Sequence, residues 1–177
     1  MTKKSDVYQN RYLAHQERKQ KQIKTRPETG TTNLTFEEVI ETRRSRRRFK
    51  KNNADLIKRV LRLAENRPSS CNRKGVYIKM VTAKEVGDLL VGGVGWIPKA
   101  NKVLLFFADM KAYKSPNEVI FMPYLDAGVY AMYVSLIAEY NGVANCIVNP
   151  NIRAEDQFKF NKKFNKKGHK LCCALVC

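Results

Sequence analysis

The chain has 177 residues, of which 44% are hydrophobic, and a net charge of +18. This length and apolar content suit one domain with a buried core. The charge predicts attraction to anionic ligands or polyanions, and we expect any binding of nucleic acid to be at most non-specific. We find no apolar N-terminal signal and no run of about 18 apolar residues, which argues against export and a membrane span and favours a cytoplasmic protein.

The five cysteines favour reduced thiols over disulfides or a metal site. Their number is odd and no CxxC pair occurs. Cys172, Cys173 and Cys177 share one apolar, strand-like segment and lack the usual spacing of metal ligands. We therefore expect buried, reduced thiols in a cytosolic protein and no metal. No Ser-His-Asp or Cys-His arrangement is recognisable, so no side chain is expected to act as a catalytic nucleophile.

Residues 1–33 are predicted to form a basic polar arm in front of a single domain that spans residues 34–177. The arm is rich in Lys and Gln and has too few apolar side chains to build a core of its own. Two roles stay open for it, an ordinary solvated tail or a contact with nucleic acid.

The first secure helix begins after Thr35, because Thr35 and Glu38 form a capping-box pattern. It delivers Arg43–Arg48 at its end. A second, amphipathic helix is predicted over Ala54–Glu65 and stops before Pro68. The later elements are expected as strands Val76–Thr82, Lys102–Asp109, Val143–Val148 and Leu171–Cys177, and as helices Ala83–Val91, Pro123–Asn141 and Arg153–Asn165.

Two of the later helices carry more detailed expectations. Pro123 suits the first turn of the long helix and Gly142 its C-terminal cap. Because the long helix is apolar nearly all round, we expect the core to bury one side and a second subunit to cover another. In the basic helix after it, Phe158 and Phe164 are expected to point inward.

The stretch Arg43-Arg44-Ser45-Arg46-Arg47-Arg48-Phe49 is the strongest chemical signal in the chain. Guanidinium groups are planar forks of donors that match phosphate oxygens and keep their charge. Ser45 adds a neutral donor, so the stretch predicts a phosphate site. A solvated basic patch or a localisation signal is the competing interpretation. Favourable charge at a helix C-terminus accounts for only the first one or two arginines.

A second polar stretch, Pro68-Ser69-Ser70-Cys71-Asn72, lies between the second helix and the first strand. Its hydroxyl, amide and backbone groups could hydrogen-bond the edge of a heteroaromatic ring or a ribityl chain. Turn chemistry alone also accounts for these residue types. Farther along, Trp96 is either a core residue or the wall of a pocket.

Taken together and in this order, the two stretches resemble the N-terminal half of the nitroreductase family of FMN-dependent oxidoreductases. The resemblance also includes Asp126-Ala127-Gly128, which is similar to the family's D-x-G on its central helix. The chain departs from the family at Lys74 and Gly75, where many members have Gln-Pro, and the family's usual extension after the last strand is not found. The residues that carry the two main blocks are Arg43, Arg44, Ser45, Arg47 and Phe49, followed by Pro68, Ser69, Ser70 and Asn72.

The resemblance implies an α+β fold with a central, mostly antiparallel sheet flanked by helices, and a homodimer that shares its flavin sites. FMN would be bound through its phosphate by Arg43, Arg44 and Ser45, with Arg47 at the N1–C2=O edge of the ring. Pro68, Ser69, Ser70 and Asn72 of the other subunit would meet the ring and ribityl chain. Backbone groups near Ile147 and Val148 would face the flavin N5 edge.

The implied activity is transfer of hydride from NADH or NADPH through the flavin to an electron-poor small molecule. Two other hypotheses stay open. The chain could be a non-catalytic or truncated family member, or a basic nucleic-acid-binding protein that uses the arm and the arginine stretch.

Overall fold

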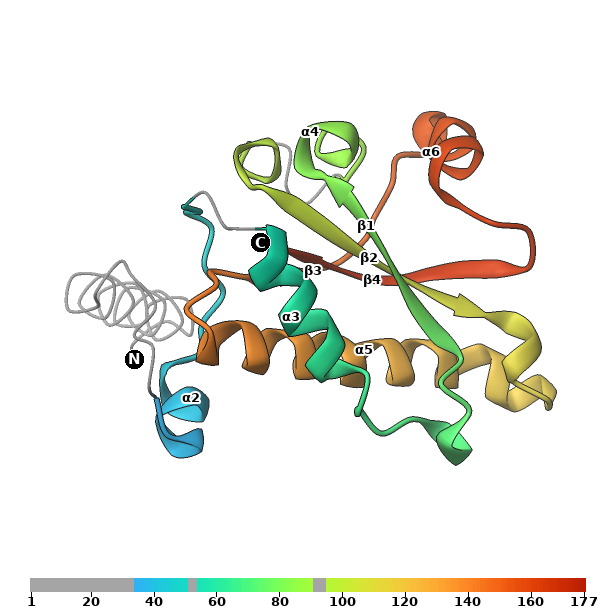
Figure 1. Ribbon diagram of the computed structural model, residues 1–177. Coiled ribbons are helices and arrows are strands. Elements are labelled where there is room, and N and C mark those ends of the chain that lie inside the picture. Colours follow the sequence, from blue (N-terminus) through green and yellow to red (C-terminus); the bar gives the residue numbers. More distant parts are fainter. Residues whose placement is uncertain (1–33, 51–53, 91–94) are drawn as a thin grey trace, which may run out of the picture.

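The computed structural model describes residues 34–50, 54–90 and 95–177, so the arm predicted over residues 1–33 lies outside it (Figure 1). The described helices are α2 (Phe36–Thr42), α3 (Ala54–Ala64), α4 (Ala83–Val86), α5 (Pro116–Tyr140) and α6 (Gln157–Phe164). The strands are β1 (Val76–Thr82), β2 (Lys102–Asp109), β3 (Cys146–Val148) and β4 (His169–Val176). Short 3-10 turns are η1 (Ser70–Asn72), η3 (Ile97–Lys99), η4 (Met110–Ala112) and η5 (Ala154–Asp156).

The four strands form one antiparallel sheet in the order β1-β2-β4-β3, which confirms the expected α+β architecture. Strand β2 pairs with β1 from Val76↔Ala108 to Thr82↔Lys102. On its other side it pairs with β4, where the register shifts between Phe106 and Phe107. Strands β1 and β3 are therefore the edges of the sheet.

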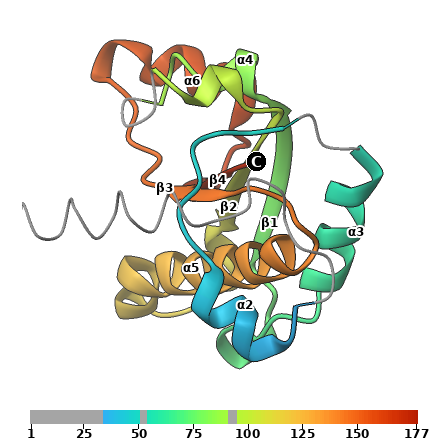
Figure 2. The same ribbon diagram turned by 90° about the vertical axis from the view of Figure 1, so that its left-hand side faces the viewer.

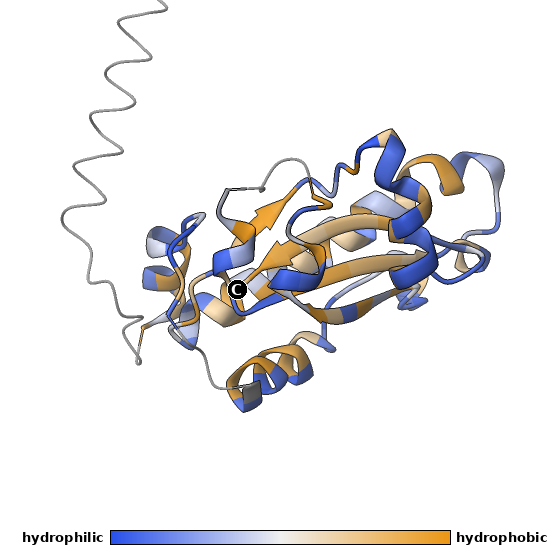
Figure 3. Cartoon of the chain, turned by 90° about the horizontal axis from the view of Figure 1, so that it is seen from above, coloured by the Kyte–Doolittle hydropathy of each residue, from blue (hydrophilic) through white to orange (hydrophobic). Residues whose placement is uncertain are grey.

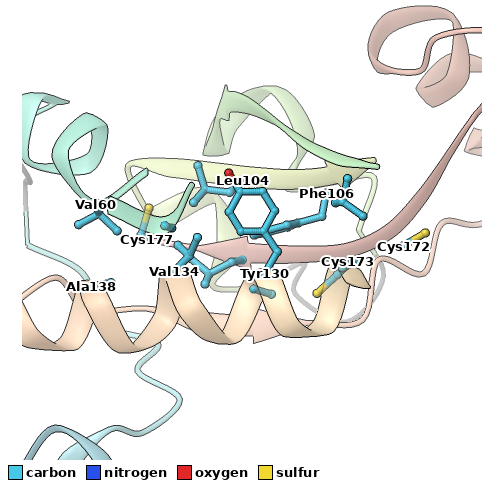
Figure 4. Close-up of a cluster of buried hydrophobic side chains, with 14 of the residues drawn as sticks. Val60, Leu104, Phe106, Tyr130, Val134, Ala138, Cys172, Cys173 and Cys177 are labelled. Carbon is cyan, nitrogen blue, oxygen red and sulfur yellow. The ribbon is translucent and has the colours of Figure 1, made fainter. Parts of the chain in front are cut away.

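The sheet is covered on both faces, as Figures 1 and 2 show. Leu104 and Phe106 of β2 join the cluster under α3 and α5, and part of this cluster is drawn in Figure 4. Leu105 and Phe107, which alternate with them, join the cluster under α4 and α6. These four side chains are at most 1% exposed, and each contributes about 1.5–3 kcal/mol through burial. Because β2 is buried on both faces, its sequence is a continuous apolar run without alternating polar residues.

Helix α5 begins at Pro116, earlier than the predicted start at Pro123. The Ser115 hydroxyl accepts a hydrogen bond from Glu118 N at 3.1 Å, and the Glu118 carboxylate accepts from Ser115 N at 3.3 Å. This capping box, with Pro116 in the first turn, sets the N-terminus. Pro123 instead lies inside the helix, where it lacks one backbone donor. At the other end Gly142 has a φ of 70° and follows the helix as predicted.

The expectation for α6 was wrong in one residue. Phe158 is 78% exposed, whereas Phe160 and Phe164 are buried one helical turn apart with ring centroids 5.0 Å from each other. The buried face of α6 therefore begins two residues later than the sequence indicated. Other bounds also differ from the prediction: α4 ends at Val86, with Val91 of the predicted range outside the described residues, and β3 begins at Cys146. Helix α6 spans Gln157–Phe164 instead of Arg153–Asn165, and β4 spans His169–Val176 instead of Leu171–Cys177.

All five cysteines are free thiols, but only four of them are buried. Cys71 is exposed in η1, which corrects the expectation of buried thiols throughout. Burial raises the pKa of the Cys172 and Cys173 thiols to about 11 and that of Cys177 to about 12. These three groups therefore stay protonated near neutral pH.

Helix α5 is long and apolar enough to span a membrane by length and composition alone, although the sequence predicted no membrane span. Its 18-residue window has a mean hydropathy of 1.4, and 39% of that window is buried within the fold. The helix packs against β2, β4 and α3. A core helix of this kind passes the same test, and the hydropathy of α5 is accounted for by its packing on the sheet together with an exposed apolar side.

Candidate functional site

The arginine stretch leaves the end of α2 and crosses toward β3 (Figure 2). Helix α2 starts with the predicted capping box: Glu38 N donates to the Thr35 hydroxyl at 3.2 Å, and Thr35 N donates to the Glu38 carboxylate at 2.7 Å. The Glu38 carboxylate accepts from the Thr35 N–H and also from the Thr35 hydroxyl at 3.0 Å, and these two bonds, the first more than the second, hold the pKa of Glu38 below its usual value. Arg43 ends the helix, with its N–H donating to Val39 O at 2.9 Å. We call residues 43–50 the arginine segment.

Arg43 and Ser45 are the most available donors of the arginine segment. Within the described residues no hydrogen-bond partner is present for either side chain. Arg44 is partly engaged, because its Nη1 donates to the carbonyls of Glu41 and Arg43 at 2.9 Å each. It thereby caps the last turn of α2 and keeps its other guanidinium donors. Arg48 is exposed on the outside of the segment.

Arg46 points inward, and two of its guanidinium nitrogens are engaged by a buried carboxylate. Its Nε donates to Glu139 Oε2 at 3.2 Å, and its Nη2 donates to Oε1 of the same carboxylate. Only 5% of the Glu139 side chain is exposed, so this is a bidentate ion pair with a buried partner. The Arg46 N–H also donates to Asn145 O at 2.9 Å. Asn145 is itself fully buried and hydrogen-bonded to Ser135. The arginine segment is thus fixed to the end of α5.

Arg47 and Phe49, which follow this anchor in the chain, both contact Trp96. The Arg47 guanidinium lies 5.6 Å from the Trp96 ring centroid, and the Phe49 ring stacks on Trp96 at 6.0 Å. Trp96 is half-buried at the margin of the cluster under α4 and α6. It is therefore neither a full core residue nor a free pocket wall, but a support for the arginine segment. A contact of Arg47 with a flavin ring stays a prediction.

The structure brings the predicted residues of β3 next to the arginine segment. Asn145, which accepts the Arg46 N–H, directly precedes β3. Ile147 and Val148 are half-buried and pair with Leu175 and Ala174 of β4 on one side only. Their other side is the edge of the sheet, where backbone donors and acceptors are not used by a strand.

The second polar stretch forms a tight loop over residues 68–75, which we call the serine loop. Pro68 is exposed, and Cys71, Asn72 and Lys74 have positive φ angles of 49°, 55° and 52°. A Cβ on Gly75 would lie 2.7 Å from the Cβ of Ala112, so the loop passes η4 too closely for any other residue. This contact is a physical reason for glycine at a position where the chain departs from the family pattern.

A buried carboxylate on α5 anchors the serine loop. Asp126 Oδ1 accepts hydrogen bonds from both the N–H and the hydroxyl of Ser70 at 2.9 Å, and Oδ2 accepts from the Tyr113 hydroxyl at 3.0 Å. Burial, followed by the nearby Asp126 carboxylate, raises the pKa of Tyr113. A second tie joins Arg73 to the Glu118 carboxylate and to Ala112 O at 3.1 Å each.

Arg67 supports the start of the same loop, a role for which the sequence holds no local signal. It is 3% exposed, and its guanidinium lies 3.4 Å from the Tyr130 ring centroid. It donates to Val76 O at 2.7 Å and pairs with Glu65, which also accepts from the Tyr130 hydroxyl at 2.8 Å. Burial, followed by this hydrogen bond, raises the pKa of Tyr130.

The two anchors share one signal, although the sequence had singled out Asp126 only as part of the D-x-G pattern and Glu139 not at all. Asp126 and Glu139 are buried acidic residues in the apolar helix α5, and each holds one of the two polar segments. They are thirteen positions apart, which corresponds to about 20 Å along an α-helix. Within one chain the arginine segment is therefore held at the C-terminal end of α5, and the serine loop nearer its middle.

The sequence matches no protein-family model and no curated protein. The fold, in contrast, matches many solved structures. A candidate nitroreductase from Exiguobacterium sibiricum, solved in complex with FMN, is 18% identical with a TM-score of 0.69; the match covers 84% of this chain and 89% of that one. A nitroreductase family protein from Streptococcus pneumoniae is 13% identical with a TM-score of 0.70, over 80% and 88% of the two chains.

Two further neighbours carry the names of more specific activities. An FMN-dependent nitroreductase from Clostridium difficile is 22% identical with a TM-score of 0.62, over 78% of this chain and 83% of that one. An enone reductase that catalyses a key step of fatty acid saturation in gut bacteria is 15% identical with a TM-score of 0.70. The match covers 82% of this chain and 89% of that one. The chain therefore has the nitroreductase fold, and the resemblance that the sequence motifs predicted is confirmed at the level of the fold.

Proposed function

We propose that this protein is an FMN-dependent oxidoreductase that takes hydride from NADH or NADPH and passes it through the flavin to an electron-poor small molecule. The observation that carries the proposal is the arginine segment. Its outward donors, Arg43 and Ser45, are unengaged within the described residues, while Arg46 fixes the backbone between them and β3. Free donors on a fixed backbone suit the phosphate of FMN, and the structures with the same fold include a protein solved with FMN.

The residues present fit the chemical parts of FMN. The phosphate needs fixed cations, which Arg43 and the free donors of Arg44 supply together with the Ser45 hydroxyl. Each charge-assisted hydrogen bond is expected to contribute about 1.5–3 kcal/mol. The half-buried edge strand β3 offers backbone groups of Ile147 and Val148 to the ring. The flavin supplies the redox chemistry, and the protein binds it, orients it and sets its electrostatics.

We propose that the serine loop that completes each site comes from a second copy of the chain. The exposed side of α5 is apolar: Phe121, Leu125, Met132 and Tyr140 are each 41–55% exposed. Gly128 lies on the same side, and a Cβ built there meets no atom within 4 Å. An exposed glycine inside a helix costs about 1 kcal/mol relative to alanine, and close approach of a partner helix offers a reason for it.

A two-fold axis near Met132 would join the two halves of the site. Antiparallel packing of α5 on its symmetry mate would set Asp126 of one copy opposite Glu139 of the other, because both lie about equally far from Met132. The serine loop of one copy would then face the arginine segment of the other. Such an interface is isologous, and an obligate dimer of this kind buries on the order of 2,000 Å² or more.

The acceptor class follows from the reaction type and from the names of the neighbours. These names include nitroreductase, NAD(P)H:FMN oxidoreductase and enone reductase. Nitroaromatics, quinones and enones share an electron-poor π system, which suits hydride acceptance from a reduced flavin. Free cysteines suit a cytoplasmic, reducing compartment.

The test is anaerobic reduction of the FMN-loaded protein. We expect purified chain to bind FMN, and NADH or NADPH to bleach its absorbance band, which a nitroaromatic or enone then restores. A chain that binds FMN but is not reduced by either nucleotide would identify a non-catalytic flavoprotein. A chain that binds no FMN would refute the proposal. Gly128→Leu serves as the structural variant, and we expect it to lose dimer and FMN together.

A further inference from the structure

The backbone of the serine loop adopts disfavoured φ angles and therefore needs support from the surrounding residues. Left-handed φ angles at Cys71 and Lys74 are disfavoured for residues with a side chain, and Asn72 tolerates such angles best. Three such residues within four positions persist only where the surroundings determine them. The local hydrogen bonds, from Asn72 N to Ser69 O and from Lys74 N to the Ser69 hydroxyl, close the turn without fixing it to the fold.

Besides the tie of Arg73 to Glu118 and Ala112, the contacts that fix the middle of the loop come from Asp126. Ser70 gives both of its donors, the N–H and the hydroxyl, to the same carboxylate oxygen of Asp126. The other oxygen of Asp126 is held by the Tyr113 hydroxyl. Asp126 is 5% exposed, so its charge is removed from water and compensated by these three hydrogen bonds. Ser70 therefore has no donor left for a ligand, contrary to the role that the family resemblance implied.

The groups that remain free on the loop lie on either side of Ser70. The Asn72 side chain is exposed and has no hydrogen-bond partner within the described residues. The Ser69 hydroxyl accepts from Lys74 N at 2.9 Å and keeps its own proton to donate. A polar ligand that approaches the loop from outside would meet these two side chains, not Ser70.

We propose that Asp126 is the positioning residue of the flavin site: it holds Ser70 so that Asn72 and Ser69 of the loop are presented to the flavin. This inference rests on the proposed function, because it assigns the parts of the same site. Asp126 never touches the ligand. Asp126 affects FMN binding only by holding the conformation of the loop. When Asp126 is replaced, the contact between Asn72 and the flavin should therefore weaken.

The experiment measures FMN binding by fluorescence titration in a double-mutant cycle between Asp126→Asn and Asn72→Ala. We expect Asp126→Asn to weaken binding about 10-fold, because the amide cannot accept all three hydrogen bonds. Asn72→Ala should weaken binding about 10-fold in the wild-type background and less than 2-fold in the Asp126→Asn background. Arg43→Ala should cost the same factor in both backgrounds, since it acts on the phosphate. Asp88→Asn, an exposed carboxylate elsewhere, is the matched control and should change nothing.

Equal losses from Asn72→Ala in the two backgrounds, or wild-type affinity in Asp126→Asn, would overturn the positioning role while leaving the proposed function intact. If Asp126→Asn fails to fold, Tyr113→Phe with Ser70→Ala takes its place and the same coupling to Asn72 is required. If the wild-type chain binds no FMN, the proposed function fails and the inference fails with it. Hydrogen exchange of the loop amides in flavin-free protein separates the cases, because Asp126→Asn should speed exchange over residues 69–75 only.

Discussion

Loss of the Arg46 guanidinium should destabilise the fold more than it weakens flavin binding. Replacing Arg46 with Ala leaves the Glu139 carboxylate without its partner, and Glu139 is only 5% exposed. Breaking a fully buried pair costs about 3–5 kcal/mol. Because 27% of the Arg46 side chain is exposed, water can reach one side of the pair, and we expect a smaller loss of about 2–3 kcal/mol.

Chemical denaturation followed by circular dichroism measures this loss. Arg48→Ala is the matched control, since the Arg48 side chain is exposed, and it should stay within about 0.5 kcal/mol of wild type. Arg46→Ala combined with Glu139→Gln should recover part of the loss, because the buried charge is removed as well. The reasoning would be refuted if Arg46→Ala left stability unchanged and weakened FMN binding as strongly as Arg43→Ala. Arg46 would then be a phosphate ligand and the ion pair incidental.

Three further predictions concern the phosphate contacts, the thiols and the charge. Arg43→Ala should weaken FMN binding by about 1.5–3 kcal/mol in a fluorescence titration while Arg48→Ala has little effect, and equal losses would contradict the assigned roles. In native protein at pH 8, iodoacetamide should label the exposed Cys71 but not Cys172, Cys173 or Cys177. Burial gives these three groups pKa values of about 11 to 12, so they stay protonated and unreactive at pH 8. Labelling of the three below pH 9 without unfolding would argue against their burial. Any binding to duplex DNA should be independent of sequence and fall steeply with salt, and deletion of residues 1–32 should remove much of it without changing flavin content; a salt-resistant, sequence-selective complex would oppose this view.

The elements that the sequence predicted well carry their own local signals. The capping box at Thr35 and Glu38 fixed the start of α2, and the bounds of β1 and β2 agree with the prediction. Strand β2 was recognisable because burial on both faces leaves an unbroken apolar run. The long helix was recognised but misplaced at its start, because Pro123 is a strong local signal and the capping box at Ser115 was overlooked.

The parts that could not be predicted depend on contacts between residues far apart in the sequence. Nothing local distinguishes Arg46 from Arg43, since the difference arises from Glu139 on another element. Ser70 likewise looks the same as Ser69 until Asp126 is placed beside it. The motifs therefore located the two polar segments, whereas the division of each segment into ligand contacts and anchors required the tertiary structure.

Mixing two variants that each weaken FMN binding tests most directly whether the flavin site is shared between two copies of the chain. Arg43→Ala removes a phosphate contact and Asn72→Ala a loop contact, so neither homodimer would contain an intact site. In a mixed dimer one site combines both defects and the other has neither. The two variants are mixed in equal amounts, unfolded and refolded together. We predict that FMN binding is then partly restored, with one tight site in each mixed dimer. No restoration on mixing, or a monomer that holds FMN in sedimentation, would contradict the account.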